Sequence, residues 1–270
     1  MSVPVFCVDS FCDKPFRGNP AGVCLIEAFP SDEWMQKFAA EMRLSETAFL
    51  VQKSLGKYDL RWFTPEVEVK LCGHATLASA HILYTEGLVE EGDPIEFMTL
   101  SGLLIARREG SRVVLDFPTS IPERKAVKPD PAEVLGFEPL FVGESTSDFL
   151  FLVAPDEETV LKAAPETEKL MQFERHAVII TARCEREGVD FVSRMFAPKY
   201  GIYEDPVTGS AHCVLTPYWS AQLGKMEMVA EQVSERGGRL AVRLLGERVE
   251  LLGSAVTIWR GELGSDAFPV

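Results

Sequence analysis

The feature that most constrains the fold of this chain is a long-range internal repeat. The stretch RWFTP (Arg61–Pro65) resembles RMFAP (Arg194–Pro198), and Gly73-His74-Ala75 matches Gly209-Ser210-Ala211, 136 positions later. The same offset carries further matches, which are Gly102 with Gly238, Arg107 with Arg243, Gly110 with Gly246 and Leu115 with Leu251. Because the register is kept over a long span, at an offset close to half of the 270 residues, the repeat predicts two similar domains.

The repeat predicts an N-terminal domain over residues 1–118 and a C-terminal domain over residues 130–270. Between them, the stretch PTSIPERKAVKPDPAE (118–133) is rich in Pro and charge, which is typical of a linker. The segment 254–263 (SAVTIWRGEL) has no counterpart near the linker. It reads as an extra strand that could pair with either domain.

Each half contains the same kinds of predicted element. Short runs rich in Val, Phe and Thr, such as VPVFCVDSF and TAFLVQ, predict strands. SDEWMQKFAAEM predicts a helix with Ser31 as its N-cap, an apolar helix is expected after Gly73, and a hairpin should turn at Glu109-Gly110. The fold class is therefore α+β, with two pseudo-symmetric domains. In each, a curved, barrel-like, mostly antiparallel sheet would surround a central helix.

Composition and charge exclude several classes of function. The net charge of −14 argues against binding to a nucleic-acid backbone, which requires clustered Lys and Arg. No apolar run approaches the length of a membrane helix, and the first residues lack the pattern of a signal peptide. The six cysteines form no C-x-x-C pair, so they are expected to be reduced thiols. We therefore expect a cytoplasmic protein that has no contact with nucleic acid or membrane.

Two glycines open the central helices of the two halves. A helix N-terminus carries unsatisfied N–H groups and a partial positive charge, and glycine lets a ligand approach the backbone closely. If the two halves face each other about a pseudo-twofold axis, the helix starts at Gly73 and Gly209 would together bind a small anion. The alternative is that both glycines serve only tight packing.

The two copies differ where chemistry would be expected. His74 aligns with Ser210, and Cys72 aligns with Thr208. Since the second copy has no thiol at this place, racemisation by two cysteines is disfavoured, and Cys72 is expected to pack beside the site. Glu46 adds a carboxylate from the first half. Together with Asp205 from the second half, these groups are the ingredients for removing and returning a proton.

Four stretches of the sequence carry a resemblance to a known family. They are GNPAGV (18–23), SETAF (45–49), RWFTPEVEVKLCGHATLA (61–78) and EDPVTGSAH (204–212), which lie in order across most of the chain. They resemble the PhzF-like family of phenazine biosynthesis, which is related in fold to diaminopimelate epimerase. The resemblance implies two pseudo-symmetric domains, an active site at the domain interface, catalysis without a cofactor and, often, a homodimer.

The resemblance also implies the catalytic residues. The family's glutamate, histidine and aspartate match Glu46, His74 and Asp205 of this sequence. We expect Glu46 to remove a proton from an activated carbon and redeliver it elsewhere, as a buried carboxyl group can do. His74 and Asp205 would orient a small anionic substrate. The expected substrate-binding residues are Asn19, Cys72, Gly73, Thr208, Gly209 and Ser210.

The sequence allows three other interpretations of the site, and it disfavours two of them. A non-catalytic anion-binding or interaction protein could retain the same cleft. A thiol nucleophile formed by Cys72 and His74 is disfavoured, because side chains two positions apart on a helix do not face each other. Metal binding is not expected, since no H-E-x-x-H or clustered Cys and His spacing is present, and no dinucleotide or phosphate-loop motif appears. His212 is left as a weak candidate for the edge of the site.

Overall fold

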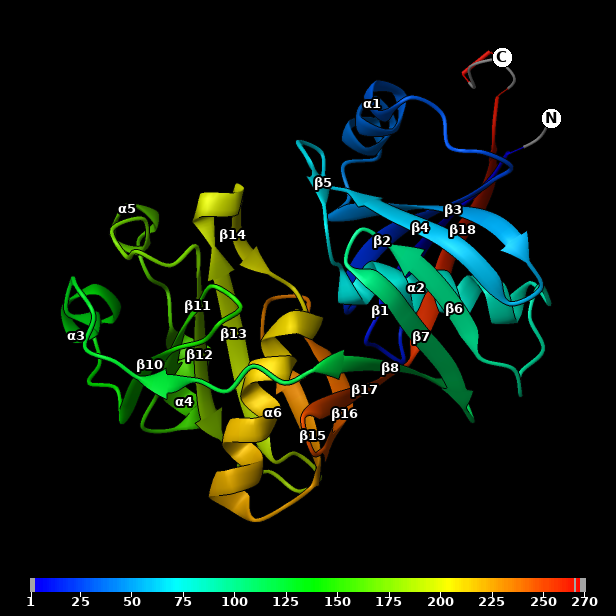
Figure 1. The fold of residues 1–270 in the computed structure, drawn as a ribbon. Coiled ribbons are helices and arrows are strands. Elements are labelled where there is room, and N and C mark those ends of the chain that lie inside the picture. Colours follow the sequence, from blue (N-terminus) through cyan, green and yellow to red (C-terminus); the bar gives the residue numbers. More distant parts are fainter. Residues whose placement is uncertain (1–2, 265, 268–270) are drawn as a thin grey trace. The chain divides into compact units, whose positions relative to one another are not determined.

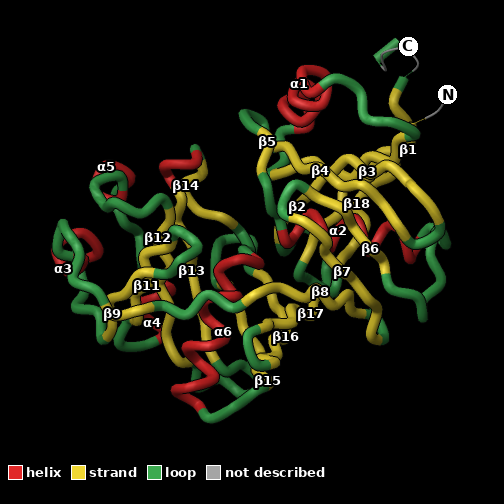
Figure 2. The backbone as a smooth tube through the Cα atoms, in the orientation of Figure 1, coloured by secondary structure: helices red, strands yellow, loops and turns green. Residues whose placement is uncertain are grey.

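The computed structural model describes residues 3–264, 266 and 267, and it divides into two compact units (Figure 1). Unit 1 contains the chain up to Asp116 together with the segment from Leu252 onward, and unit 2 is Phe117–Leu251. Strands make up most of the regular structure and helices are few, as Figure 2 shows. The fold class is α+β, as the repeat predicts.

Unit 1 is built on a mixed sheet in which antiparallel pairs predominate. Its chain-consecutive pairs β1–β2, β3–β4, β6–β7 and β7–β8 are antiparallel, whereas β2–β3 and β4–β6 are parallel. The elements of this unit are β1 (Val3–Ser10), β2 (Asn19–Ile26), α1 (Asp32–Met42), β3 (Glu46–Ser54), β4 (Lys57–Phe63), β5 (Glu68–Val69), α2 (Gly73–Thr85), β6 (Ile95–Thr99), β7 (Gly102–Glu109), β8 (Arg112–Pro118) and β18 (Ala255–Leu263).

Helix α2 lies in the core of unit 1. All of its residues except His81 and Thr85 are buried, and it contacts β1, β2, β3, β7 and β18. The sequence GHATLASAHILYT is apolar or small on every side, and a helix of this kind has no face suited to water. The hydroxyls of Thr76 and Ser79 donate to helix carbonyls one turn earlier, so burial leaves them satisfied.

Unit 2 repeats the strand order and directions of unit 1. The pairs β10–β11, β12–β13 and β15–β16 are antiparallel, and β11–β12 and β13–β15 are parallel. The elements of this unit are β9 (Glu123–Arg124), α3 (Pro131–Leu135), β10 (Phe141–Glu144), β11 (Phe149–Val153), α4 (Glu157–Lys162), α5 (Thr167–Leu170), β12 (Ala177–Arg183), β13 (Phe191–Ala197), a 3₁₀ turn (Pro198–Tyr200), β14 (Ile202–Asp205), α6 (Gly209–Leu223), β15 (Glu227–Gln232), β16 (Gly238–Leu245) and β17 (Arg248–Gly253).

The repeated motifs occupy equivalent places in the two units. Arg61 on β4 forms a two-pronged ion pair with Glu68, and Arg194 on β13 does the same with Glu204. In each unit the arginine also lies opposite a residue of the neighbouring antiparallel strand. Arg61 is opposite Phe49 on β3, and Arg194 is opposite Ile180 on β12. The duplication therefore extends from sequence to topology and to individual side-chain contacts.

The structure differs from the sequence-based expectation in the segment 118–133. This stretch does not stay an irregular linker, because Glu123 and Arg124 form β9 against β10 and Pro131 opens α3 with Asp130 as its N-cap. The last strand, left open by the sequence, pairs antiparallel with β1 from Val3↔Leu263 to Ser10↔Ala255. Among the described residues, no helix is both long enough and apolar enough to cross a membrane.

Candidate active site

Helix α2 begins at a residue whose backbone is extended. Cys72 is the N-cap, with φ −146° and ψ 111°, and the helix proper starts at Gly73. Because Cys72 lies outside the helix, the rule that helical side chains two positions apart do not face each other does not apply to it. Its Sγ lies 3.5 Å from Nδ1 of His74. The expectation that these two side chains would not face each other is therefore wrong, since it assumed that both residues were helical.

Glu46 reaches the same place from a different element. It is the first residue of β3, and its Oε2 lies 3.1 Å from Nε2 of His74. The side chain of His74 is 6% exposed and that of Glu46 is 14% exposed, so little water competes for this contact. The carboxylate, the imidazole and the thiol of Cys72 thus form one compact group, with one polar atom from each within 4.8 Å of the others.

Two buried polar side chains hold His74 in place. Ser10, at the end of β1, donates its hydroxyl to the His74 carbonyl at 2.8 Å. Asn19, at the start of β2, places its amide nitrogen 3.2 Å from the ring Nδ1. Since Asn19 contacts Nδ1 and Glu46 contacts Nε2, both ring nitrogens are engaged and the ring orientation is fixed.

The charges in this group are set by the environment. Burial lowers the pKa of His74, but the neighbouring Cys72 and the Glu46 carboxylate outweigh burial and leave the pKa well above its usual value near 6.5. Burial raises the pKa of the Cys72 thiol, the negative charge of Glu46 raises it further, and His74 opposes both. The environment therefore favours the protonated form of the His74 ring and the protonated form of the Cys72 thiol.

In unit 2 the predicted residues gather at the start of α6. Thr208 is the N-cap, and its hydroxyl donates to Oδ2 of Asp205, which is 8% exposed. Gln232 on β15 closes the group, because its side-chain oxygen accepts from the Thr208 amide at 2.9 Å and its nitrogen donates to the Asp205 carbonyl at 2.7 Å. This polar cluster fixes the loop that leads into the helix.

His212 lies one turn inside α6 and has a structural contact. Its Nδ1–H donates to the carbonyl of Thr208 at 2.8 Å, and the side chain is fully buried. Burial lowers the pKa of His212 to about 4, against a smaller opposing effect of that carbonyl. His212 is therefore neutral near pH 7 and ties the N-cap to the helix. Gly209 is buried and Ser210 is half-buried at the helix start.

The structure thus sorts the predicted residues by unit. Glu46, His74, Cys72, Gly73 and Asn19 come together in unit 1, whereas Asp205, Thr208, Gly209 and Ser210 come together in unit 2. Sequence reasoning missed Ser10 and Gln232. Both are distant in sequence from the groups that they hold, and no local pattern marks either of them.

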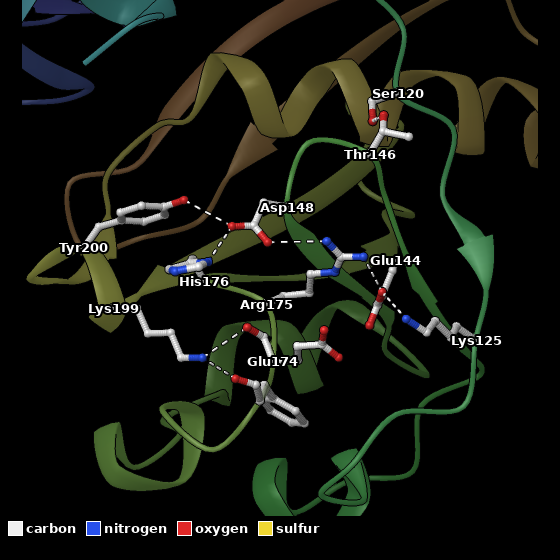
Figure 3. A network of polar contacts seen from close by, with 11 residues as sticks. Ser120, Lys125, Glu144, Thr146, Asp148, Glu174, Arg175, His176, Lys199 and Tyr200 are labelled. Atoms are coloured by element: carbon white, nitrogen blue, oxygen red, sulfur yellow. Dashed lines mark hydrogen bonds and ion pairs between the residues drawn. The ribbon is translucent and has the colours of Figure 1, made fainter.

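The position of Glu46 has no acidic counterpart in unit 2. Phe49 on β3 and Ile180 on β12 are equivalent, because each lies opposite the repeated arginine of its unit. Glu46, which precedes Phe49 on β3, is therefore equivalent to Ala177, which precedes Ile180 by the same number of residues on β12. The two basic residues that precede Ala177 in the chain, Arg175 and His176, contact acidic side chains of unit 2, as Figure 3 shows. Arg175 contacts Glu144 at 2.5 Å, and His176 contacts Asp148 at 2.5 Å. The network contributes to the structure of unit 2, where the pair of His176 and Asp148 is largely exposed, whereas the pair of His74 and Glu46 in unit 1 is mostly shielded from water.

Comparison with known proteins agrees with these observations. Residues 8–261 match the family model of phenazine biosynthesis-like proteins, PhzC-PhzF. An uncharacterized isomerase of Halalkalibacterium halodurans is 46% identical over 97% of this chain and 99% of its own length. A PhzF-family crystal structure from Enterococcus faecalis superposes with a TM-score of 0.92 at 42% identity, covering 98% of this chain and all of the other. A predicted epimerase from Pseudomonas aeruginosa shares the fold, with a TM-score of 0.75 at 23% identity over 96% of this chain and 98% of its own.

The duplicated fold, the buried acid–imidazole pair and the curated relatives define an isomerase with an epimerase-like fold. More particularly, the chain belongs to the PhzC-PhzF family of phenazine biosynthesis-like proteins.

Proposed function

We propose that this isomerase moves a proton between two positions of a small carboxylated metabolite, without a cofactor, and that Glu46 carries the proton. The observation that supports this most directly is the contact of 3.1 Å between Glu46 and His74 at the start of α2. A carboxylate held there lies beside a helix N-terminus, where negative charge is stabilised.

The proposed reaction returns Glu46 to its starting protonation state. The Glu46 carboxylate takes a proton from a carbon made acidic by conjugation with the substrate carboxylate, and the C–H electron pair moves into an enolate-type anion. The resulting Glu46 carboxylic acid then protonates a different carbon and becomes a carboxylate again. His74 holds Oε2 of Glu46 in place, so the other oxygen, Oε1, is the proposed carrier of the proton.

The start of α2 supplies the second requirement, which is stabilisation of the anion. The backbone amides of Gly73 and His74 belong to the first turn, whose N–H groups have no helical acceptor. The raised pKa of His74 favours a positive charge on this ring, in a place that is shielded from water. We propose that these groups bind the negative charge of the substrate and of its enolate.

The proposal extends to unit 2 through the repeat. Asp205, with the amides of Gly209 and Ser210, would contact the same substrate and orient it. Pseudo-symmetry of the two helix starts supports this part, since α6 opens with glycine as α2 does. Asp205→Asn would then slow the reaction. Thr208→Val, which removes the hydroxyl bound to Asp205 but keeps the carboxylate, tests whether the cluster acts only as a loop support.

Proton transfer can be measured without knowing the physiological substrate. The protein is incubated in heavy water with a panel of small carboxylic acids that have an acidic C–H, and deuterium in the recovered acid is followed by mass spectrometry. Wild-type protein should introduce deuterium at one carbon. Glu46→Gln should lower the rate by roughly 10²–10⁴-fold, the usual contribution of a general acid–base group.

A matched variant controls for the loss of one carboxylate. Glu27 is exposed just after β2, and Glu27→Gln should exchange at the wild-type rate. Wild-type exchange in Glu46→Gln would rule out Glu46 as the base. Tight binding of an acid by the wild-type protein, with no exchange for any member of the panel, would favour the non-catalytic anion-binding alternative.

A further inference from the structure

We propose that Glu46, Cys72 and His74 bind one zinc ion, and that the bound ion switches off proton transfer at this site. The inhibitory part rests on the function proposed above, whereas the binding part does not. The three side chains belong to unit 1, so the candidate metal site is complete within one compact unit.

The distances suit a zinc ion. Zinc binds sulfur at about 2.3 Å and nitrogen or oxygen at about 2.0–2.2 Å, so tetrahedral ligand atoms lie roughly 3.3–3.7 Å from one another. In this group Nε2 of His74 is 3.1 Å from Oε2 of Glu46 and 4.0 Å from Sγ of Cys72. Because Sγ of Cys72 lies nearer to Nδ1 of His74, at 3.5 Å, zinc binding at Nε2 requires a rotation of the Cys72 side chain toward Nε2.

The donor atoms also suit the charge of the ion. Thiolate, imidazole and carboxylate are the three ligand types that zinc prefers in proteins. On binding, the Cys72 thiol would release its proton to solvent, and a protonated His74 ring would release its Nε2 proton to solvent too, so that the imidazole binds as the neutral ring. One thiolate and one carboxylate then balance the two positive charges. A zinc ion buried here would therefore leave no net charge in the core.

The surroundings provide a second shell and an open position. Asn19 lies 3.2 Å from Nδ1 of His74, the ring nitrogen opposite the proposed ligand atom. With zinc on Nε2, the proton would sit on Nδ1, and a turn of the Asn19 amide would offer its oxygen as acceptor. Three protein ligands leave a fourth position for water or for a substrate carboxylate.

The second copy of the fold shows that the group is not part of the shared scaffold. The positions equivalent to Glu46, Cys72 and His74 in unit 2 hold Ala177, Thr208 and Ser210. None of these three side chains is a usual zinc ligand. Unit 2 thus serves as an internal comparison, in which the same helix start has no metal-binding group.

The consequence for the proposed reaction is direct. Zinc on Glu46 would occupy the carboxylate that accepts the proton, and zinc on Nε2 of His74 would replace the contact that holds this carboxylate in place. The metal-free form would be the active form, and zinc would act as an inhibitor rather than as a cofactor. Added chelator should then protect the activity, and substoichiometric zinc should reduce it in proportion to the sites filled.

The binding step is tested on the full-length protein after treatment with chelator. Zinc is titrated by calorimetry and by competition with a chromogenic chelator, and cobalt is used as a spectroscopic probe. We expect one ion per chain and a thiolate-to-cobalt charge-transfer band in the near ultraviolet. Cys72→Ser should abolish the band and weaken zinc binding by more than the roughly 10–100-fold typical of second-shell changes.

A second buried thiol provides the matched control. Cys213 is a buried thiol on α6, and Cys213→Ser should keep both the band and the affinity. Circular dichroism of each variant would show that the fold is retained. Equal zinc binding by Cys72→Ser and wild-type protein, or no binding by the wild-type protein at micromolar zinc, would overturn the proposal.

The outcomes separate this inference from the proposed function. Stoichiometric zinc binding that depends on Cys72, in a protein that exchanges no deuterium, would keep the metal site and reject the proton-transfer reaction. Deuterium exchange that continues at the same rate with the site filled by zinc would reject the inhibitory role. Exchange that stoichiometric zinc abolishes in wild-type protein, and that a chelator restores, would support both parts.

Discussion

At the scale of single residues, two buried histidines show how the surroundings decide charge. His74 and His212 lie near the starts of equivalent helices, and both are buried. For His74, Cys72 and then the carboxylate of Glu46 outweigh the effect of burial, and the pKa is raised well above 6.5. For His212 the ring donates to the Thr208 carbonyl, and burial lowers the pKa to about 4. At pH 6 the His74 ring is therefore favoured in its positively charged form, whereas the His212 ring is neutral.

This contrast gives a prediction for the ring protons. In a proton NMR titration, the His74 ring should change its shift well above pH 6.5 and the His212 ring near pH 4. Glu46→Gln removes the charge that favours the imidazolium, so it should lower the pKa of His74. His212 should be unchanged in that variant. An unshifted His74 titration in Glu46→Gln would show that the carboxylate does not set the charge of the ring.

At the scale of elements, a proline inside α6 determines where a backbone carbonyl bonds. Pro217 has no N–H, so the carbonyl of Cys213, four residues earlier, lacks its helical donor. That carbonyl instead accepts the backbone N–H of Ser120 at 3.1 Å. The interruption of the helix thus fixes the segment that follows β8 against α6, within unit 2.

Replacing this proline should release that segment. In Pro217→Ala the restored N–H competes for the Cys213 carbonyl, so the Ser120 amide should lose protection against hydrogen exchange while the helix gains one bond. Hydrogen-exchange mass spectrometry of the peptide around Ser120 measures this. Peptides from α2 provide the comparison and should be unaffected. Undiminished protection at Ser120 would mean that the bond does not depend on the proline.

At the scale of the whole molecule, two histidines with a lowered pKa make stability depend on acid. His212 in unit 2 and His81 in unit 1 both have a pKa lowered to about 4, chiefly by burial. Because the unfolded chain binds protons on these rings near pH 6.5 and the folded chain does not, unfolding becomes easier as the pH falls from about 6.5 to 4. His74 has the opposite sign: its stabilising effect is complete below pH 6.5 and is lost only as the pH rises through its raised value.

The acid dependence can be measured by urea unfolding at a series of pH values. The free energy of unfolding should fall by about 3 kcal/mol between pH 6.5 and 4 on account of His212 alone. His212→Gln should be less stable at pH 7, since the Gln side chain replaces a packed ring, but its stability should depend less on pH in this window. The same slope in both proteins would show that His212 does not titrate on unfolding.

Much of the fold could be predicted because its signals are local or repeated. The helix with Ser31 as N-cap forms as α1, with the Ser31 hydroxyl accepting from Trp34, and the hairpin turns at Gly110 with φ +60°. The repeat predicted two similar halves, and the two units share the same strand directions. The segment 118–133 was harder, because its β9 pairs with β10, and local composition does not report pairing.

For the site, the sequence alone determined which residue types stand at the helix starts, because the repeat aligns them and the asymmetry singles out Cys72, His74 and Glu46. Only the tertiary structure decided that these three side chains meet. Glu46 lies more than twenty positions before His74 in the chain, and the pairing of β3 with β2 and the burial of α2 close that separation. Sequence spacing cannot show a candidate metal site of this kind, because its ligands come from different elements and are brought within bonding distance only when the core packs.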